Sequence, residues 1–346
     1  MKKVLDILKK REALLGVIII LFSLFVTIRV PQFLTYENLS NVLKSCSVTG
    51  IFALGVLVVT ISGGFDVSFT AIAQVSEYLA IWLLINTFIG RIGNLFVAFV
   101  LVILIGGALG LFNGFLIDHF KLPAIIITIS TQNLFYGIMY VVCHGRLIYT
   151  IPKYIWPLSD KKIFEAVSAN GATYGISMVT VLWIVMAILL AVVLKKTVIG
   201  RSVYWIGGNA LAAERVGINM RKMALFVYGL TGAIAGVGSL AHVAIVQTVI
   251  PNSIVGTEMS VIAAVVLGGA SITGGKGSVF GSFLGVLLFA IVNNSLTLLQ
   301  ISSYWYNVFT GAIIVLSIIL NAVQERQQKK RIIRVKVDEN LEGVAV

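Results

Sequence analysis

The chain has 346 residues, of which 58% are hydrophobic and only 12% charged, and its formal net charge is +12. A soluble domain of this length needs more charged surface than that. Nucleic-acid binding is excluded as well, because the basic residues gather beside apolar runs and no base-contacting motif accompanies them. We therefore expect an all-α integral membrane protein.

The apolar residues occur in long runs that predict about ten membrane-spanning helices. A helix needs roughly 20 apolar residues to cross a bilayer. The first run lacks a small-residue cleavage site, which favours a retained span over a signal peptide. In chain order, the predicted spans are 13–30, 48–61, 66–86, 95–117, 124–143, 176–194, 223–246, 256–272, 279–299 and 304–320, with the second and third also compatible with one broken hairpin.

Basic clusters orient these spans. They lie at the N-terminus, in the loop 195–222 and in the tail, and an even number of predicted spans separates each from the next. All three clusters then fall on one side, which the positive-inside rule makes cytoplasmic, so both termini are expected inside. We predict a single membrane domain over 1–322, a basic cytoplasmic tail over 323–346, and a longest external loop at 144–175 that carries a short amphipathic helix.

Glycines recur every four residues in two predicted spans. Such spacing places small residues on one helix face, where it lets backbones pack closely. The two spans run in opposite directions, which indicates two inverted, pseudo-symmetric halves of the kind found in transporters. The predicted packing glycines are Gly106, Gly110 and Gly114 in one span and Gly277, Gly281 and Gly285 in the other.

Few ionisable residues fall within the spans, namely Asp66, Glu77 and Glu258. Each is a candidate functional group, because a charge inside a bilayer is costly. Asp66 has the alternative role of capping a helix that begins at Val67. Glu77 is the deepest of the three.

Neutral polar residues within the spans are more numerous. They either bond between helices or line a path that suits a neutral hydroxylated solute better than an ion. Besides Thr128 and Gln132, the candidates for a solute path are Asp66, Gln74, Glu77, Asn113, Asn133, Asn293 and Asn294.

Motifs for catalysis, metals and nucleotides are missing. The segment Gly274–Ser278 departs from the phosphate-binding loop, which requires glycine, four residues and then Gly-Lys-Ser/Thr. The histidines lie on separate segments, and Cys46 and Cys143 fit neither a metal site nor a disulfide framework. We expect no catalytic residue, no metal and no ATP bound by this chain itself.

Five segments in register carry a resemblance to a known family. They are ISGGFDVSFT (Ile61–Thr70), GLFNGFLI (Gly110–Ile117), KLPAIIITIS (Lys121–Ser130), IGRSVYWIGGNALAAERVGI (Ile199–Ile218) and VIAAVVLGGASITGGKGSVFGSFLG (Val261–Gly285). Over nearly its whole length the chain resembles the permease subunits of bacterial ABC importers for ribose and similar sugars, a group that includes the autoinducer-2 permeases.

The resemblance implies partners and a location. The permease would lie in the bacterial cytoplasmic (inner) membrane and form a dimer of identical or different chains. A cytoplasmic ATP-binding subunit would hold ATP and Mg²⁺, and a periplasmic or extracellular binding protein would deliver the solute.

The resemblance also assigns a role to the basic loop 195–222, in which Ala212-Ala213 followed by Gly217 is similar to the core of the helix that couples import permeases to their ATPase. Leu211 stands where many of these permeases have Glu. The implied coupling residues are Arg201, Gly208, Asn209, Leu211, Ala212, Ala213 and Gly217.

Our hypothesis is therefore an ABC permease for a small polar solute, expected to be a pentose or related monosaccharide. The alternative is an ion-coupled secondary transporter, which requires an essential embedded acid, with Glu77 as the candidate. A membrane-embedded enzyme is a third possibility, for which the sequence offers no catalytic set.

Overall fold

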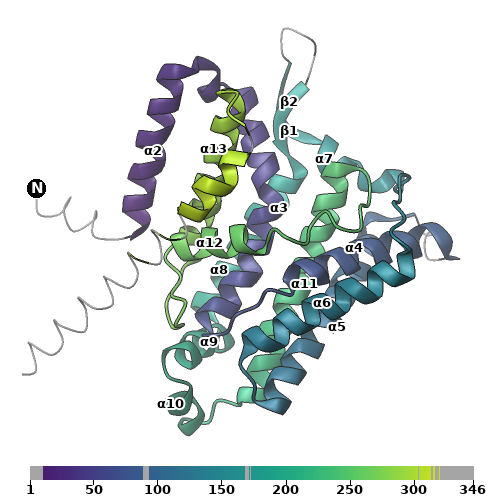
Figure 1. Ribbon diagram of the computed structural model, residues 1–346, viewed down its shortest axis with the longest axis vertical. Coiled ribbons are helices and arrows are strands. Elements are labelled where there is room, and N and C mark those ends of the chain that lie inside the picture. The colour runs from purple at the N-terminus through teal and green to yellow at the C-terminus, as the bar shows by residue number, and fades with distance from the viewer. Residues whose placement is uncertain are drawn as a thin grey trace, which may run out of the picture.

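The computed structural model describes residues 11–88, 93–167, 171, 173–302, 304–312, 315 and 319. Within this part of the chain, 8 helices are long and apolar enough to cross a membrane (Figure 1). They are α2 (Arg11–Arg29), α3 (Tyr36–Ile61), α4 (Phe69–Asn86), α5 (Leu95–Phe120), α6 (Ala124–Cys143), α8 (Met178–Lys196), α11 (Met220–Val246) and α13 (Val279–Leu298). The predicted helical membrane fold is thereby confirmed.

Two predicted spans differ from the structure, and a third lies partly outside the described residues. The region 256–272 holds only α12 (Glu258–Leu267), whose 10 residues reach about 15 Å, half of a roughly 30 Å hydrocarbon core. α3 begins at Tyr36 rather than at residue 48, because a polar first half capped by Thr35 precedes its apolar half. Residues 304–312 are helical, while part of the predicted span 304–320 and the whole tail 323–346 lie outside the described residues.

The loop 144–175 is more ordered than its sequence predicts. It contains η3 (Lys153–Ile155) and α7 (Pro157–Asp160), and then an antiparallel hairpin of β1 (Lys162–Val167) and β2 (Thr173–Ser177). The all-α expectation missed this hairpin. The strands rest on the start of α3, where the Tyr36 hydroxyl donates to the carbonyl oxygen of Phe164 at 2.8 Å. This hairpin end of the molecule lies opposite α9 (Val198–Gly208) and α10 (Ala210–Arg215) (Figure 1).

α3 and α11 form the centre of the bundle. In the apolar 18-residue stretch of each of these two helices, 72% is buried, against 22% in the corresponding stretches of α5 and α6. α11 packs on α3, α4 and α5, while α3 also packs on α8, α12 and α13. Trp183 of α8 is fully buried and fills the space above Gly50 of α3, where a methyl group would overlap its ring.

Glycines bring α5 and α11 into backbone contact. A methyl group at Gly106 would overlap the carbonyl oxygen of Gly232, and one at Gly110 would overlap that of Tyr228. In α13, Gly285 lies in the same way against Ala264 of α12 and Gly281 against Gly268 just after it, whereas Gly277 precedes α13 and lies against Ile61. Close backbone packing of this kind stabilises helix pairs in lipid, where no hydrophobic effect favours association.

This interface yields a stability test with a neighbouring control. We expect Gly106→Ala to destabilise the protein by about 1–3 kcal/mol, because the new methyl group has no room against α11. Gly107→Ala should be neutral or slightly stabilising, since its Cβ would meet Ala233 at 3.8 Å and alanine favours helix. Thermal unfolding of both variants in detergent measures the difference, and equal stabilities would contradict the packing described.

Candidate functional site

A polar cavity of about 280 Å³ lies between α3 and α13. Its wall on α3 carries the hydroxyls of Ser45 and Thr49, which are four residues apart and therefore share a helix face. Asn293 and Asn294 of α13 form the facing wall. Among the described residues, the lining consists of Ser45, Cys46, Thr49, Val286, Phe289, Ala290, Asn293, Asn294, Thr297 and Tyr306. All of these side chains are uncharged, so the cavity offers hydroxyl and amide groups within an otherwise apolar wall.

Two asparagines join the walls of this cavity. Asn38 Nδ2 donates to Asn294 Oδ1 at 3.0 Å, and Asn294 Nδ2 donates to Asn38 Oδ1 at 2.9 Å. The pair ties the first turn of α3 to α13. Of the sequence-predicted path residues, Asn293 and Asn294 are the two that line the cavity.

Asp66 and Asn113 meet in a separate buried cluster through Ser68. Asp66 Oδ1 accepts hydrogen bonds from the backbone N–H of Ser68 at 2.8 Å and from its hydroxyl at 2.6 Å. Asn113 Nδ2 in turn donates to the Ser68 hydroxyl at 2.7 Å. Asp66 thus holds the turn before α4, which begins at Phe69 and not at Val67, and its contacts are those of a helix-start anchor.

Glu258 anchors the start of α12 in a comparable way. Its Oε1 accepts from the Thr70 hydroxyl at 2.5 Å, from Gln132 Nε2 at 2.6 Å and from the backbone N–H of Gly256 at 2.9 Å. One carboxylate oxygen therefore connects α4, α6 and α12. Donors supplied by the protein offset the cost of burying this acid.

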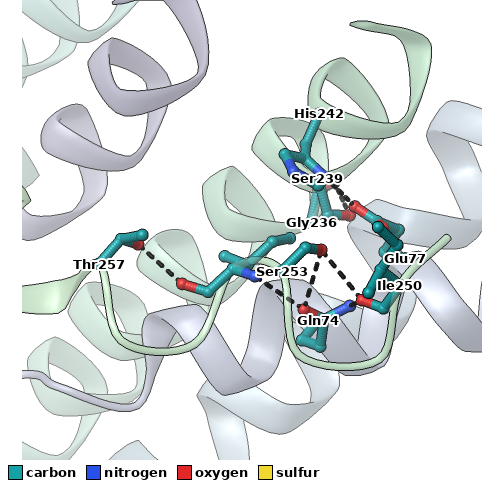
Figure 2. Close-up of polar contacts among 9 residues, drawn as sticks. Gln74, Glu77, Gly236, Ser239, His242, Ile250, Ser253 and Thr257 are labelled. Atoms are coloured by element: carbon teal, nitrogen blue, oxygen red, sulfur yellow. Dashed lines mark hydrogen bonds and ion pairs between the residues drawn. The ribbon is translucent and has the colours of Figure 1, made fainter. Parts of the chain in front are cut away.

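Gln74 and Glu77 hold α4 to its neighbours (Figure 2). Gln74 Nε2 donates to the carbonyl oxygen of Ile250, and its Oε1 accepts from the backbone N–H of Ile254, both at 2.9 Å. The carboxylate of Glu77 lies 2.8 Å from His242 Nδ1 of α11. The Gln74 bonds fasten the segment between α11 and α12, and the Glu77–His242 contact joins α4 to α11. None of these residues is among those that line the cavity.

Asn133 does not join any of these groups. It is exposed on α6, and its Nδ2 donates to the carbonyl oxygen of Ile129 in the same helix at 2.8 Å. The seven predicted path residues therefore separate into cavity walls, helix anchors and one solitary side chain. Ser45, Thr49, Asn38 and His242 were missed by the sequence analysis, and the four-residue spacing of Ser45 and Thr49 was the available signal for the cavity.

The basic loop folds into α9 and α10, which project from the end of the bundle opposite the hairpin (Figure 1). α10 is capped at both ends. Asn209 Oδ1 accepts from the backbone N–H of Ala212 at 3.0 Å, and Gly217, with φ +91°, closes the other end while Ile218 N donates to the carbonyl oxygen of Ala213 at 3.1 Å. The motif residues Asn209 and Gly217 therefore shape α10.

The side chains of α10 divide by exposure. Ala213 is only 3% exposed and faces the protein, whereas Leu211 and Val216 are each 71% exposed. Arg201, Gly208 and Ala212 are also exposed. Two apolar side chains presented to solvent on a short capped helix form a surface that a partner can cover.

Glycines join this loop to the cavity helices. A methyl group at Gly207 of α9 would overlap the carbonyl oxygen of Ile61, and Gly275 N donates to that same oxygen at 2.8 Å. A methyl group at Gly274 would lie 2.7 Å both from Gly63 Cα and from the carbonyl oxygen of Gly207. We call Gly63, Gly207, Gly274 and Gly275 the glycine junction. It brings together α9, the end of α3 and the segment that leads into α13, so the failed phosphate-loop motif is a packing element.

The described residues contain no candidate metal site. Among the described residues, no three His, Cys, Asp or Glu side chains gather closely enough to hold a metal ion. The buried acids instead bond to neutral donors and to one histidine.

Comparison with known proteins identifies relatives along most of the chain. The ribose import permease protein of Haemophilus influenzae is 34% identical over 293 residues, covering 84% of this chain and 86% of the relative. The ribose import permease protein of Bacillus subtilis is 31% identical, covering 91% and 93%. The galactose/methyl galactoside import permease protein of Salmonella typhimurium is 28% identical, covering 92% and 96%. No solved structure matches the chain.

These relatives confirm the resemblance that the five sequence segments indicate. A family model described as the branched-chain amino acid transport system / permease component matches residues 38–318, which include every element described above except α2 and η1 (Pro31–Leu34). The chain belongs to this family of transport-system permease components.

Proposed function

We propose that this chain is the membrane-spanning subunit of an ABC importer that carries a pentose or related monosaccharide across the bacterial inner membrane. The lining of the cavity between α3 and α13 is the observation that favours a sugar over an amino acid as the solute. The family description names branched-chain amino acids, while similar relatives are named for ribose and galactose. An amino acid brings an ammonium and a carboxylate, which need counter-charges away from water. The described residues of the cavity lining supply hydroxyls and amides but no charged side chain, which suits a sugar.

The size of the cavity agrees with a small solute. Its volume of about 280 Å³ lies just below the roughly 300–1,000 Å³ of sites that hold drug-sized ligands. A few hydroxyl and amide contacts give weak binding, which a transport path needs in order to release its solute. Affinity would then reside chiefly in an external binding protein.

We further propose ten membrane crossings, with both termini inside and two inverted halves. The packing partners support this arrangement, because α11 lies against α5 and α4 while α3 lies against α13 and α12. A buried acid anchors the start of α4 and another the start of α12, Asp66 and Glu258. The short α12 and the irregular segment 268–278 would together complete one crossing.

We propose that α10 docks on a cytoplasmic ATPase subunit, which holds ATP and Mg²⁺. Leu211 and Val216 supply its exposed apolar contacts, and Leu211 stands where many import permeases have Glu, so the contact would be apolar rather than ionic. Movement of α10 would pass through α9 and the glycine junction to α3 and α13. Those two helices form the cavity walls, so the junction offers a direct mechanical route from ATPase to solute.

This chain is a transport subunit and not an enzyme. The ion-coupled alternative relied on Glu77, but that side chain is paired with His242 outside the cavity. A second permease chain and the binding protein complete the proposed importer.

The first prediction separates the two transport mechanisms. In cells expressing the chain with its ATPase and binding protein, we expect Glu77→Gln to retain most ribose uptake, because glutamine can still accept a hydrogen bond from His242. Inactivating the ATPase should abolish uptake, and excess leucine should not compete. Loss of uptake in Glu77→Gln together with survival after ATPase inactivation would contradict the ABC mechanism.

The second prediction concerns the docking surface. Leu211→Asp places a charge in the proposed apolar contact and should weaken ATPase binding by about tenfold or more, a typical loss for a central interface residue. Leu211→Met is the matched control and should bind normally. Co-purification of the ATPase with each variant measures the effect, and unchanged binding of Leu211→Asp would rule out this surface.

The third prediction concerns the glycine junction. Gly207→Ala should lower coupled ribose uptake about tenfold while the ATPase still binds, because the new methyl group separates α9 from Ile61 and Gly275. Gly208→Ala is the neighbouring control, since its Cβ would meet nothing within 4 Å. Equal uptake by the two variants would show that coupling does not pass through this contact.

A further inference from the structure

The paired amides of Asn38 and Asn294 differ in how firmly each is held. Asn38 Nδ2 also donates to the carbonyl oxygen of Phe33 at 2.9 Å. Phe33 is 1% exposed and packs with Val26, Val42 and Ile291, so the corner between α2 and α3 is fixed. Asn38 is therefore anchored on both sides.

Asn294 stands on the cavity side of the pair. It is half-buried and lines the cavity, while Asn38 is not among the lining residues. The hydrogen bonds that hold its amide are those to Asn38. Rotation about its side chain would turn the amide from Asn38 toward the cavity without disturbing the buried corner, so Asn294 is the movable member.

The chemistry of the pair matches that of a sugar. Asn294 offers Asn38 one N–H donor and one carbonyl acceptor, on two atoms bonded to the same carbon. Two neighbouring hydroxyls on a solute can present the complementary acceptor and donor. A solute with vicinal hydroxyls can therefore replace Asn38 bond for bond, whereas an analogue lacking one of them leaves an amide atom unpaired.

We propose that Asn294 is a specificity-determining residue that contacts the solute, and that Asn38 is a positioning residue that holds its amide when the cavity is empty. This inference rests on the proposed function, because it takes a polyhydroxylated solute as the occupant. The exchange of one hydrogen-bonded partner for another yields little net affinity, which keeps binding weak, yet it still discriminates by the number and placement of hydroxyls.

A cysteine reporter in the cavity tests this role. Ser45 lines the cavity and is exposed, so Ser45→Cys places a thiol there that a small methanethiosulfonate reagent can modify. Cys46→Ala and Cys143→Ala remove the two native cysteines, so that this thiol is the only one in the chain. The assay uses the assembled importer and measures how strongly ribose and 2-deoxyribose slow the modification. In this parent chain we expect ribose to protect at lower concentration than 2-deoxyribose.

The two halves of the pair should shift protection in opposite directions. Asn294→Ala should raise the half-protecting ribose concentration about tenfold and abolish the preference over 2-deoxyribose, because the discriminating amide is gone. Asn38→Ala should lower that concentration severalfold, since the competing partner of Asn294 is removed. A purely structural pair would shift both variants the same way, and that outcome would overturn the proposal.

Asn293→Ala is the matched control, because Asn293 lines the same cavity beside Asn294 without belonging to the pair. It should retain the preference for ribose. Retention of the preference in Asn294→Ala, with normal ribose protection in the parent, would overturn the role of Asn294 and leave the proposed function standing. Absence of both protection and uptake in the parent would instead overturn the proposed function.

Discussion

The close approach of backbones at glycines is the constraint on which the rest of this structure depends. Lipid tails are as apolar as the side chains that face them, so burying apolar surface does not drive helices together in a bilayer. Helices associate there through packing and hydrogen bonds. Gly106 and Gly110 place α5 directly on α11, and Gly281 and Gly285 place α13 on α12. The glycine junction does the same for α9, the end of α3 and the segment that leads into α13, where Gly207 meets Ile61. These contacts fix the helices relative to one another, and thereby fix where each polar side chain lies within the bundle.

Polar groups within the helices divide into buried ones that hold the bundle together and more exposed ones that face a cavity. Asp66 accepts hydrogen bonds from Ser68 in its own turn, while Glu258 and Gln74 also accept from donors of other segments. These hydrogen bonds compensate the burial of the three side chains. Asn293 and Asn294 line a cavity instead. Position within a span is therefore a poor guide to function, since the acids buried most deeply serve as anchors.

Sequence reasoning predicted the helical membrane class because long apolar runs leave few alternatives. It failed where polar and apolar stretches share a helix, as in the first half of α3, and where a short helix and an irregular segment mimic one span, as around α12. The strands of the hairpin after α7 have only 6 and 5 residues, too few for alternating apolar and polar side chains to distinguish them from a loop. The resemblance of Ala212-Ala213 and Gly217 to the coupling-helix motif placed α10 within a few residues, and the structure adds that Asn209 and Gly217 cap it. It did not reveal that Ala213 faces inward, since orientation depends on the packing of α9 and α10.

The neutrality of the cavity between α3 and α13 has an electrical consequence. A membrane potential does work of about 2.3 kcal/mol per 100 mV on each elementary charge that crosses it. Since the described lining residues carry no charge and the proposed cargo is a neutral sugar, solute transfer moves no charge through the cavity. The voltage across the membrane would then neither drive nor oppose that step, and the energy of ATP could go entirely into the concentration gradient of the sugar.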